Sequence, residues 1–402
     1  MKKQIAILLC LSLLLAGCGA DGKPKKNELL VETEPSVPVQ MTQAPSPEET
    51  AAPTIPASQP ESIDLSAFPK ENPYNKTTQV GVHAPQLTEA GTYSLEFIDL
   101  SREEIFKALR PEDHSALHAA EEHGYHRLHS DSGMTLTTAE GYASLNIQYD
   151  GEFQQKFTTF SELEALLQWK LDHGETDSQD LPFATQKQVQ QQCETAMSAL
   201  GIGLTPKLNS CIGITARDAR DYQQNLLKTD ADYDWLGKVY ELPELDESFD
   251  CYYLTYTFQW DGIPVYGDEW FPFISRQDVS ERYMHSTAQF LVSRDGIQDC
   301  DIFGAFQTPK LQSKQPVLSA ETAAQIACKQ LDADLGTFTP DRDQRVEYVS
   351  LCLAPTYEED SGTYLLTPIW GAETSFYAEQ DWVYSYTGGE IFLDGVTGDR
   401  FC

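Results

Sequence analysis

Apolar and polar positions alternate in two distinct patterns along the chain after its first 75 residues. Residues 251–260 form an aromatic, strand-like run that closes on the turn pair Asp261 and Gly262. Residues 185–200 and 320–331 instead have apolar positions at the helical spacing. Each helix precedes strand-like segments, so we predict an α+β fold in which a helix-plus-antiparallel-meander unit occurs twice.

The segment between residues 76 and 180 is also predicted to be α+β. Ser101 and Glu104 have the spacing of a capping box for a helix over 102–109, and 142–149 alternates like a strand. A second amphipathic helix is expected over 160–171. The predicted folded parts are an N-terminal domain over 76–180, a first helix–meander unit over 181–312 and a C-terminal unit over 313–402.

Residues 19–75 differ in composition from the rest of the chain. They hold ten of the 22 prolines, mixed with Glu, Ser, Thr and Ala, and have no helical or strand period. Such a composition buries too little apolar surface to offset the conformational entropy lost on folding. We therefore predict a disordered, proline-rich linker here.

The first 18 residues have the pattern of an export signal. Lys2 and Lys3 precede the apolar run 5–16, which is shorter than the roughly 20 residues needed to span a bilayer. The tetrad that follows resembles the bacterial lipobox: Leu15, Ala16, Gly17 and Cys18. The resemblance implies a signal peptide over 1–18, lipid attachment at Cys18, and a body at the cell membrane that faces outside the cytoplasm. An ordinary secretory signal with a chance cysteine is the alternative.

The charge of the chain restricts its partners. The formal net charge is −34, and such a field repels phosphate backbones. We therefore expect no nucleic-acid partner. We expect the negative charge to keep the protein soluble at an exposed surface. The alternative is that the charge attracts divalent cations or basic ligands.

Seven cysteines remain when Cys10 leaves with the signal and Cys18 is the anchor. None of the seven forms a C-x-x-C pair, which excludes the usual zinc-knuckle and thioredoxin-type motifs. Cys251, Cys328 and Cys352 lie in apolar patterns and are predicted to be buried. One or two disulfides are compatible with export, and their pairing stays open.

Five of the eight histidines lie between residues 114 and 129. If 112–122 is helical, His114 and His118 lie one turn apart on one face, as two metal ligands would. Ser115 occupies the position where the catalytic zinc motif requires Glu. A metal-binding or metal-dependent protein is therefore one hypothesis, and a solvated polar helix and loop is the other.

A second candidate metal site follows an expected helix over 217–228. Carboxylates occupy positions one, three, five and twelve of an EF-hand-like loop: Asp230, Asp232, Asp234 and Glu241. Trp235 stands where the loop needs glycine, and Pro243 leaves no room for an exiting helix. An acidic surface loop is the alternative.

Sequence motifs for catalysis are absent. The chain has no G-x-S-x-G elbow, no Ser-x-x-Lys pair and no Gly-rich phosphate loop, so we predict no enzyme and no cofactor. Its aromatic residues either line a glycan or peptide groove or pack a core: Trp260, Trp270, Trp370, Trp382, Tyr252 and Tyr384.

The last 90 residues resemble PepSY-type and YycI-type extracytoplasmic domains. The resemblance rests on 318–321 at the start of an Ala-rich helix, the strand 364–370, and a turn with Asp394, Thr397 and Gly398. That turn also has an ordinary explanation, because its residues favour tight turns.

The chain as a whole resembles uncharacterised lipoproteins of gut Clostridia, through the proline-rich linker and the stretch 261–265. Both resemblances imply a non-catalytic binding or regulatory lipoprotein, with an envelope protein, peptide or glycan as its ligand.

Overall fold

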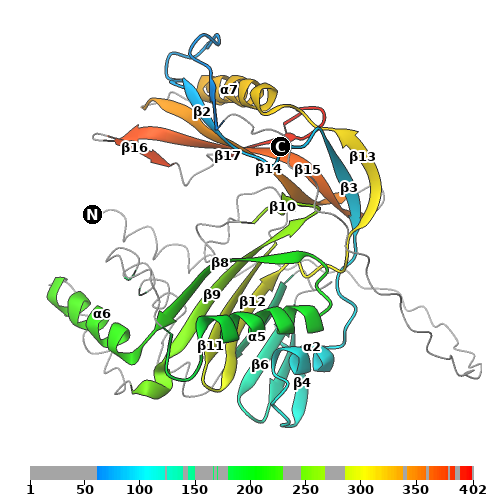
Figure 1. Cartoon of the computed structure of the whole chain (residues 1–402), viewed down its shortest axis with the longest axis vertical. Helices are drawn as coiled ribbons and strands as arrows, with labels where there is room; N and C mark the ends of the chain where they lie inside the picture. Colours follow the sequence, from blue (N-terminus) through cyan, green and yellow to red (C-terminus); the bar gives the residue numbers. More distant parts are fainter. Residues whose placement is uncertain are drawn as a thin grey trace, which may run out of the picture. The chain divides into compact units, whose positions relative to one another are not determined.

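Helices pack on two largely antiparallel sheets, which confirms the predicted α+β class (Figure 1). This computed structural model describes residues 61–122, 125–138, 144–149, 166, 170, 180–229, 246–267, 286–337, 342–358, 362–378, 381–384 and 390–400. Cys18, the acidic loop 230–241 and most of the predicted linker lie outside the described residues. Of the helix expected over 160–171, only Leu166 and Lys170 are described, and both are helical.

The first sheet has eight strands in the order β1-β2-β14-β15-β3-β13, with β16 and β17 also paired to β15. All its strand pairs are antiparallel except β2 with β14. Helix α7 (Ala320–Thr337) packs on this sheet. The strands are β1 (Ser62–Asp64), β2 (Gln79–His83), β3 (Glu89–Leu95), β13 (Lys310–Pro316), β14 (Gln344–Glu358), β15 (Thr363–Ala378), β16 (Asp381–Tyr384) and β17 (Glu390–Asp394).

The second sheet has nine strands in the order β10-β9-β11-β12-β7-β6-β5-β4, with β8 also paired to β9. Its strands are β4 (Leu117–Glu122), β5 (Tyr125–Ser130), β6 (Met134–Thr138), β7 (Ser144–Tyr149), β8 (Thr205–Ile214), β9 (Cys251–Trp260), β10 (Ile263–Pro264), β11 (Thr287–Ser293) and β12 (Gly296–Phe303). The helical elements in this part are α2 (Arg102–Leu109), α5 (Gln186–Ala199), α6 (Ala216–Thr229) and the short η3 (Glu247–Phe249). None of the helices in the described part of the chain is long and apolar enough to span a membrane.

Local signals in the sequence place several elements correctly. The Ser101 side chain accepts the backbone N–H of Glu104, and the Glu104 side chain accepts that of Ser101, so the capping box of α2 is confirmed. Asp261 and Gly262 have φ values of 51° and 77°, which the β9–β10 turn requires. The three cysteines predicted to be buried are buried.

The strands do not divide at the predicted domain boundaries. From the expected domain over 76–180, β2 and β3 join the eight-stranded sheet, whereas β4 to β7 join the nine-stranded sheet. β1 also lies inside the predicted linker, so residues 62–75 are folded. Ile63 and Leu65 alternate into the core beneath α7, where their partners come from the other end of the chain. Local periodicity cannot reveal such pairing, because the register is set by strands that are distant in the sequence.

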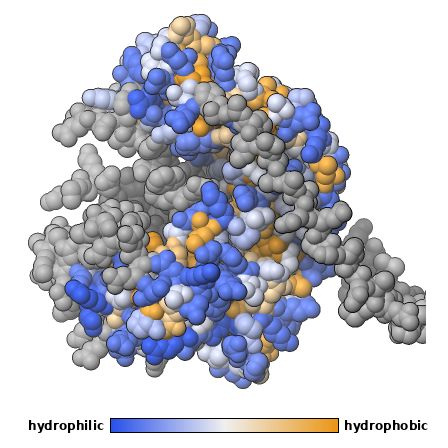
Figure 2. Space-filling view, viewed as in Figure 1, coloured by the Kyte–Doolittle hydropathy of each residue, from blue (hydrophilic) through white to orange (hydrophobic). Residues whose placement is uncertain are grey.

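Two main hydrophobic cores stabilise the packing of the helices and sheets. Small residues of α7, including Ala323, Ala324 and Ala327, are fully buried against the sheet and allow the helix to approach Trp370 closely. The larger core combines residues of both sheets, among them Tyr93 of the eight-stranded sheet and Tyr256 of the nine-stranded sheet. On the face that Figure 2 shows, apolar side chains are scattered among hydrophilic ones.

A carboxylate on α7 fixes the chain just before β2. Asp332 Oδ2 accepts the backbone N–H of Glu71 at 2.9 Å, and its Oδ1 accepts Asn72 N at 3.3 Å and Asn75 Nδ2 at 2.8 Å. Asn75 Nδ2 also donates to the carbonyl of Cys328 at 3.0 Å. The two bonds of Asn75 are buried and those of the Glu71 and Asn72 backbone are part-buried, so losing the Asp332 acceptor leaves donors without a partner.

We expect Asp332→Asn to lower the free energy of unfolding by about 2 kcal/mol, because an amide N–H₂ would replace one of the charged acceptors. The matched control is Asp334→Asn on the same helix, which weakens the partly exposed pair with Arg400 and should cost less than about 1 kcal/mol. Urea denaturation of both variants gives the comparison. Equal losses of unfolding free energy in the two variants would contradict the role of Asp332 in holding the chain before β2.

Candidate functional site

The histidine-rich segment contains a strand pair, so the helix over 112–122 on which the metal-site hypothesis depended is not present. β4 runs antiparallel to β5, and His118 stands opposite His129. His118 Nε2 lies 2.9 Å from Asp131 Oδ1 on an exposed surface, and His129 Nδ1 lies 2.8 Å from Thr135 Oγ1. Cross-strand pairing overrides the helix-forming tendency of the Ala-containing sequence.

The one-turn spacing expected for His114 and His118 is therefore not present. His114 precedes β4 and is exposed. Within the described residues, no three His, Cys, Asp or Glu side chains converge on a possible metal site. Metal binding by this cluster stays a prediction, as does binding by the undescribed loop 230–241.

The sequence-predicted aromatic residues that the structure describes pack inside the protein. Trp370 and Tyr252 are fully buried, and the half-buried Trp260 meets Tyr93 edge-on at a centroid distance of 6.2 Å. The side chains of Trp270, Trp382 and Tyr384 lie outside the described part. For the described residues, the core interpretation of these aromatics is correct.

The motif at Asp394 forms a tight turn. Asp394 Oδ1 accepts the backbone N–H groups of Val396 and Thr397 at 2.8 and 2.7 Å. Gly398 has a φ of 77° and donates its N–H to the Asp394 carbonyl at 2.9 Å. The Asp394 carboxylate thus accepts hydrogen bonds from its own turn.

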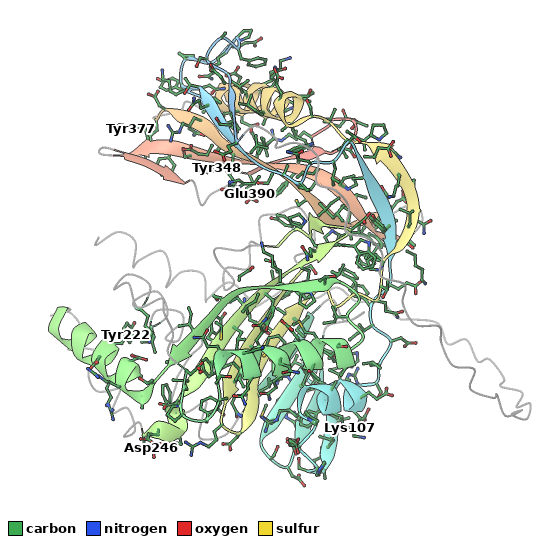
Figure 3. The ribbon with its side chains drawn as sticks, in the orientation of Figure 1. Lys107, Tyr222, Asp246, Tyr348, Tyr377 and Glu390 are labelled. Atoms are coloured by element: carbon green, nitrogen blue, oxygen red, sulfur yellow. The ribbon has the colours of Figure 1, made fainter. Side chains whose placement is uncertain are left out.

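The face of the eight-stranded sheet away from α7 carries polar side chains, as Tyr348 and Glu390 illustrate in Figure 3. Along β15, Leu366 and Trp370 enter the cores, whereas Thr363 and Leu365 alternate with them and face the other way. On β3, Tyr93 enters the core and its neighbours Thr92 and Ser94 do not.

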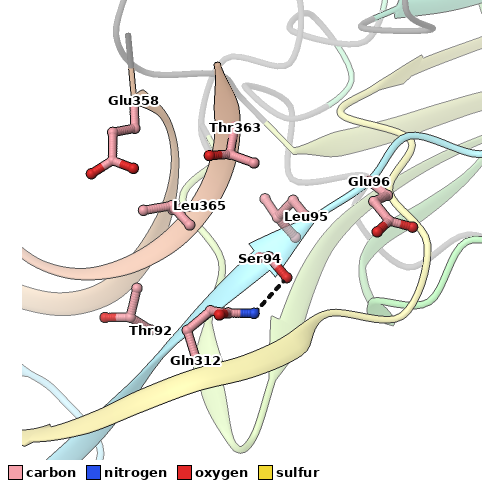
Figure 4. A pocket seen from close by; sticks show the side chains of 8 residues that line it. All are labelled: Thr92, Ser94, Leu95, Glu96, Gln312, Glu358, Thr363 and Leu365. Atoms are coloured by element: carbon pink, nitrogen blue, oxygen red, sulfur yellow. Dashed lines mark hydrogen bonds between the residues drawn. The ribbon is translucent and has the colours of Figure 1, made fainter. Parts of the chain in front are cut away.

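At one end of this face lies an open groove of about 460 Å³ (Figure 4). It is lined by residues of three distant parts of the chain: Thr92, Ser94, Leu95, Glu96, Gln312, Glu358, Thr363 and Leu365. Gln312 Nε2 donates to Ser94 Oγ at 2.9 Å, which fixes β13 against β3 at the groove wall.

The groove combines an apolar floor with polar and acidic walls. Leu365 supplies apolar surface, and the walls carry three hydroxyl groups and one amide. Glu96 lies 2.7 Å from Lys310 in an exposed ion pair, and Glu358 stands opposite Thr363 across the hairpin. Such a groove can accept hydrogen-bonding ligands and cationic groups.

The sequence contained only a partial signal for this groove. Alternation of Thr92 and Ser94 with Tyr93 and Leu95 indicates a polar face on β3. The approach of Gln312 and Glu358 to that face depends on strand pairing across more than 200 residues, which no local pattern specifies.

A second polar feature crosses the nine-stranded sheet. One register row contains only polar side chains over seven neighbouring strands: Ser210, Thr255, Gln289, Asp301, Asn146, Thr137 and Arg127. Ser210 and Thr255 share a 2.7 Å hydrogen bond, and Asn146 Nδ2 donates to Asp301 Oδ1 at 2.7 Å. Thr255 and Gln289 are buried, and the other five side chains of this polar layer are half-buried.

Two carboxyl groups lie on this layer, because Asp299 and Asp301 alternate on β12 and project to the same face. Burial raises the pKa of Asp299 well above its ordinary value, and the nearby Asp301 charge raises it further. Burial also raises the pKa of Asp301, and the hydrogen bond from Asn146 opposes this rise. The sequence signal was the i, i+2 spacing of two acids on either side of Cys300, within a strand that also contains Gln298.

Comparison with known proteins does not show a family for this chain. No family model and no curated protein matches the chain. Among solved structures, the chain is similar to an uncharacterized protein from Eubacterium rectale, with 12% sequence identity and a TM-score of 0.46. The match covers 81% of this chain and 90% of the other.

We expect Asp299→Asn to stabilise the protein increasingly as the pH rises above the ordinary carboxyl range. An acid with a raised pKa binds more protons in the folded chain than in the unfolded chain, so its contribution to stability falls with rising pH. Urea unfolding of the variant and the parent across the pH range measures this difference. Asp295→Asn, at an exposed position in the same hairpin, is the control, and parallel pH profiles for Asp299→Asn and the parent would refute the prediction.

Proposed function

We propose that this protein is a lipid-anchored, extracytoplasmic binding or regulatory lipoprotein without catalytic activity, and that the groove beside β3 is its ligand surface. The observation that carries the proposal is the open groove on the face away from α7, with donors, acceptors and carboxylates held on paired strands. Preorganised strands present such groups at little entropic cost.

The chemistry of the groove supports binding rather than catalysis. The Ser94 hydroxyl is hydrogen-bonded to Gln312 and to the Lys310 carbonyl, and Glu96 pairs with Lys310, so neither is arranged as a nucleophile with its activating base. The hydroxyl and amide groups of the groove suit recognition of a polar ligand, so an envelope protein, peptide or glycan is the proposed partner. The strongly acidic chain argues against nucleic acid.

The lipobox-like tetrad supports attachment to the cell membrane through Cys18. Two acyl chains hold a protein firmly, whereas one binds only marginally. The proline-rich sequence between Cys18 and β1 could span on the order of 100 Å when extended, enough to carry the groove clear of the lipid headgroups.

Cys18→Ala should abolish lipid attachment while leaving export possible, because the acyl chains are carried by that thiol. The parent should incorporate labelled palmitate and enter the detergent phase on partitioning, and the variant should do neither. Equal membrane retention of both proteins with no label in either would contradict the proposed anchor, as would a free Cys18 in the mature parent.

A photoreactive amino acid at Thr363, on the groove wall, should form adducts of defined mass in intact producing cells. The same amino acid at Lys107, exposed on α2, should not (Figure 3). Ser94→Tyr fills the groove and should suppress the Thr363 adducts. Equal adducts at both positions, or adducts that persist with Ser94→Tyr, would refute the groove as the ligand surface.

A further inference from the structure

The outer edge of β13 is an exposed end of the eight-stranded sheet. Within the described chain β13 pairs only with β3, and six of its seven residues are exposed. Leu311 is 54% exposed, the highest value among the exposed large apolar residues. An edge strand of this kind offers backbone N–H and C=O groups to another extended chain.

The groove lies beside this edge. Gln312 of β13 belongs to the groove wall and is hydrogen-bonded to Ser94 of β3. A strand added to β13 would lie roughly 4.8 Å farther out, so a long side chain projecting to the groove face could reach over Gln312. Backbone pairing would supply affinity, and the groove would select the side chain.

The charges and the floor of the groove favour a basic side chain. Lysine and arginine have an apolar stem, which suits Leu365, and a cationic head, which suits the Glu358 carboxylate at the rim. The chain carries a net charge of −34, so its field attracts cations and repels a second copy of itself.

Three features of the β13 edge limit its pairing with strands of other molecules. The β3–β13 register is irregular between Leu311 and Ser313, Pro316 ends the strand, and Lys310 lies at its start. Bulges, prolines and lysines at edges suppress self-association. A short segment of defined chemistry therefore fits this edge better than a long strand of the same chain.

Building on the proposed function, we propose that β13 and the adjoining groove bind an extended peptide segment of a partner protein, paired to the β13 edge and carrying a lysine or arginine side chain into the groove.

The probe is acetyl-Val-Lys-Val-Lys-Val-amide, titrated into the full folded body and followed by calorimetry and amide NMR shifts. The lysine peptide should bind saturably and shift β13 amides, whereas the matched Val-Glu peptide should not bind. Glu358→Lys should weaken binding of the lysine peptide by at least about tenfold. Glu321→Lys, the same charge change at an exposed position of α7, should alter it less than about twofold.

Backbone pairing is tested separately with two N-methylated forms of the lysine peptide, one methylated at the valines and one at the lysines. Alternate N–H groups of a strand point to opposite sides, so only one form should lose binding. The proposal would be overturned if the lysine peptide showed no saturable binding. It would also be overturned if Glu358→Lys and Glu321→Lys weakened the binding equally, or if the two methylated forms bound equally well. If one of these results is found while the photoreactive amino acid at Thr363 still forms adducts in cells, a basic peptide is not the ligand, but the groove remains the proposed ligand surface.

Discussion

Burial of one apolar core shared by the two sheets is the constraint on which the arrangement of this protein depends. Tyr93 from β3, Leu353 from β14 and Leu366 from β15 lie in the same cluster as the aromatic residues of β9 and β11. Burial of each such side chain stabilises the folded protein by about 1.5–3 kcal/mol. The Tyr93 hydroxyl also donates to Asp261 Oδ2 at 2.8 Å, which ties β3 to the β9–β10 turn. Burial and this bond hold the pKa of the Tyr93 hydroxyl above its ordinary value.

The same alternation that builds the shared core also creates the groove. When Tyr93 and Leu95 enter the core, Thr92 and Ser94 must project to the opposite face, because successive side chains of a strand alternate. The groove walls are therefore fixed by packing that lies behind them. If the groove is the ligand surface that we propose, it is already formed before binding, and little conformational entropy is lost when it is occupied.

The sequence predicted the local elements well and the assembly of the sheets poorly. The capping box of α2, the turn at Asp261 and the tight turn at Asp394 follow from short-range chemistry, and the structure contains all three. The helix expected at His114 and His118 failed because pairing of β4 with β5 outweighs local propensity.

The sheets cross the predicted domain boundaries for a related reason. β1 to β3 pair with strands near the other end of the chain, and that pairing is what brings Ser94, Gln312 and Glu358 to one groove. The acid pair on β12 could have been found from its spacing alone, whereas the groove required the tertiary structure.

We propose that the groove and the β13 edge are occupied when the protein is anchored to the cell membrane through Cys18. Hydrogen exchange of residues 310–316 in membranes of the producing cell, compared with the isolated folded body, tests this most directly. Occupancy predicts slower exchange of the β13 amides in the membranes, with α2 amides unchanged. Equal exchange of β13 in the two preparations would contradict the account.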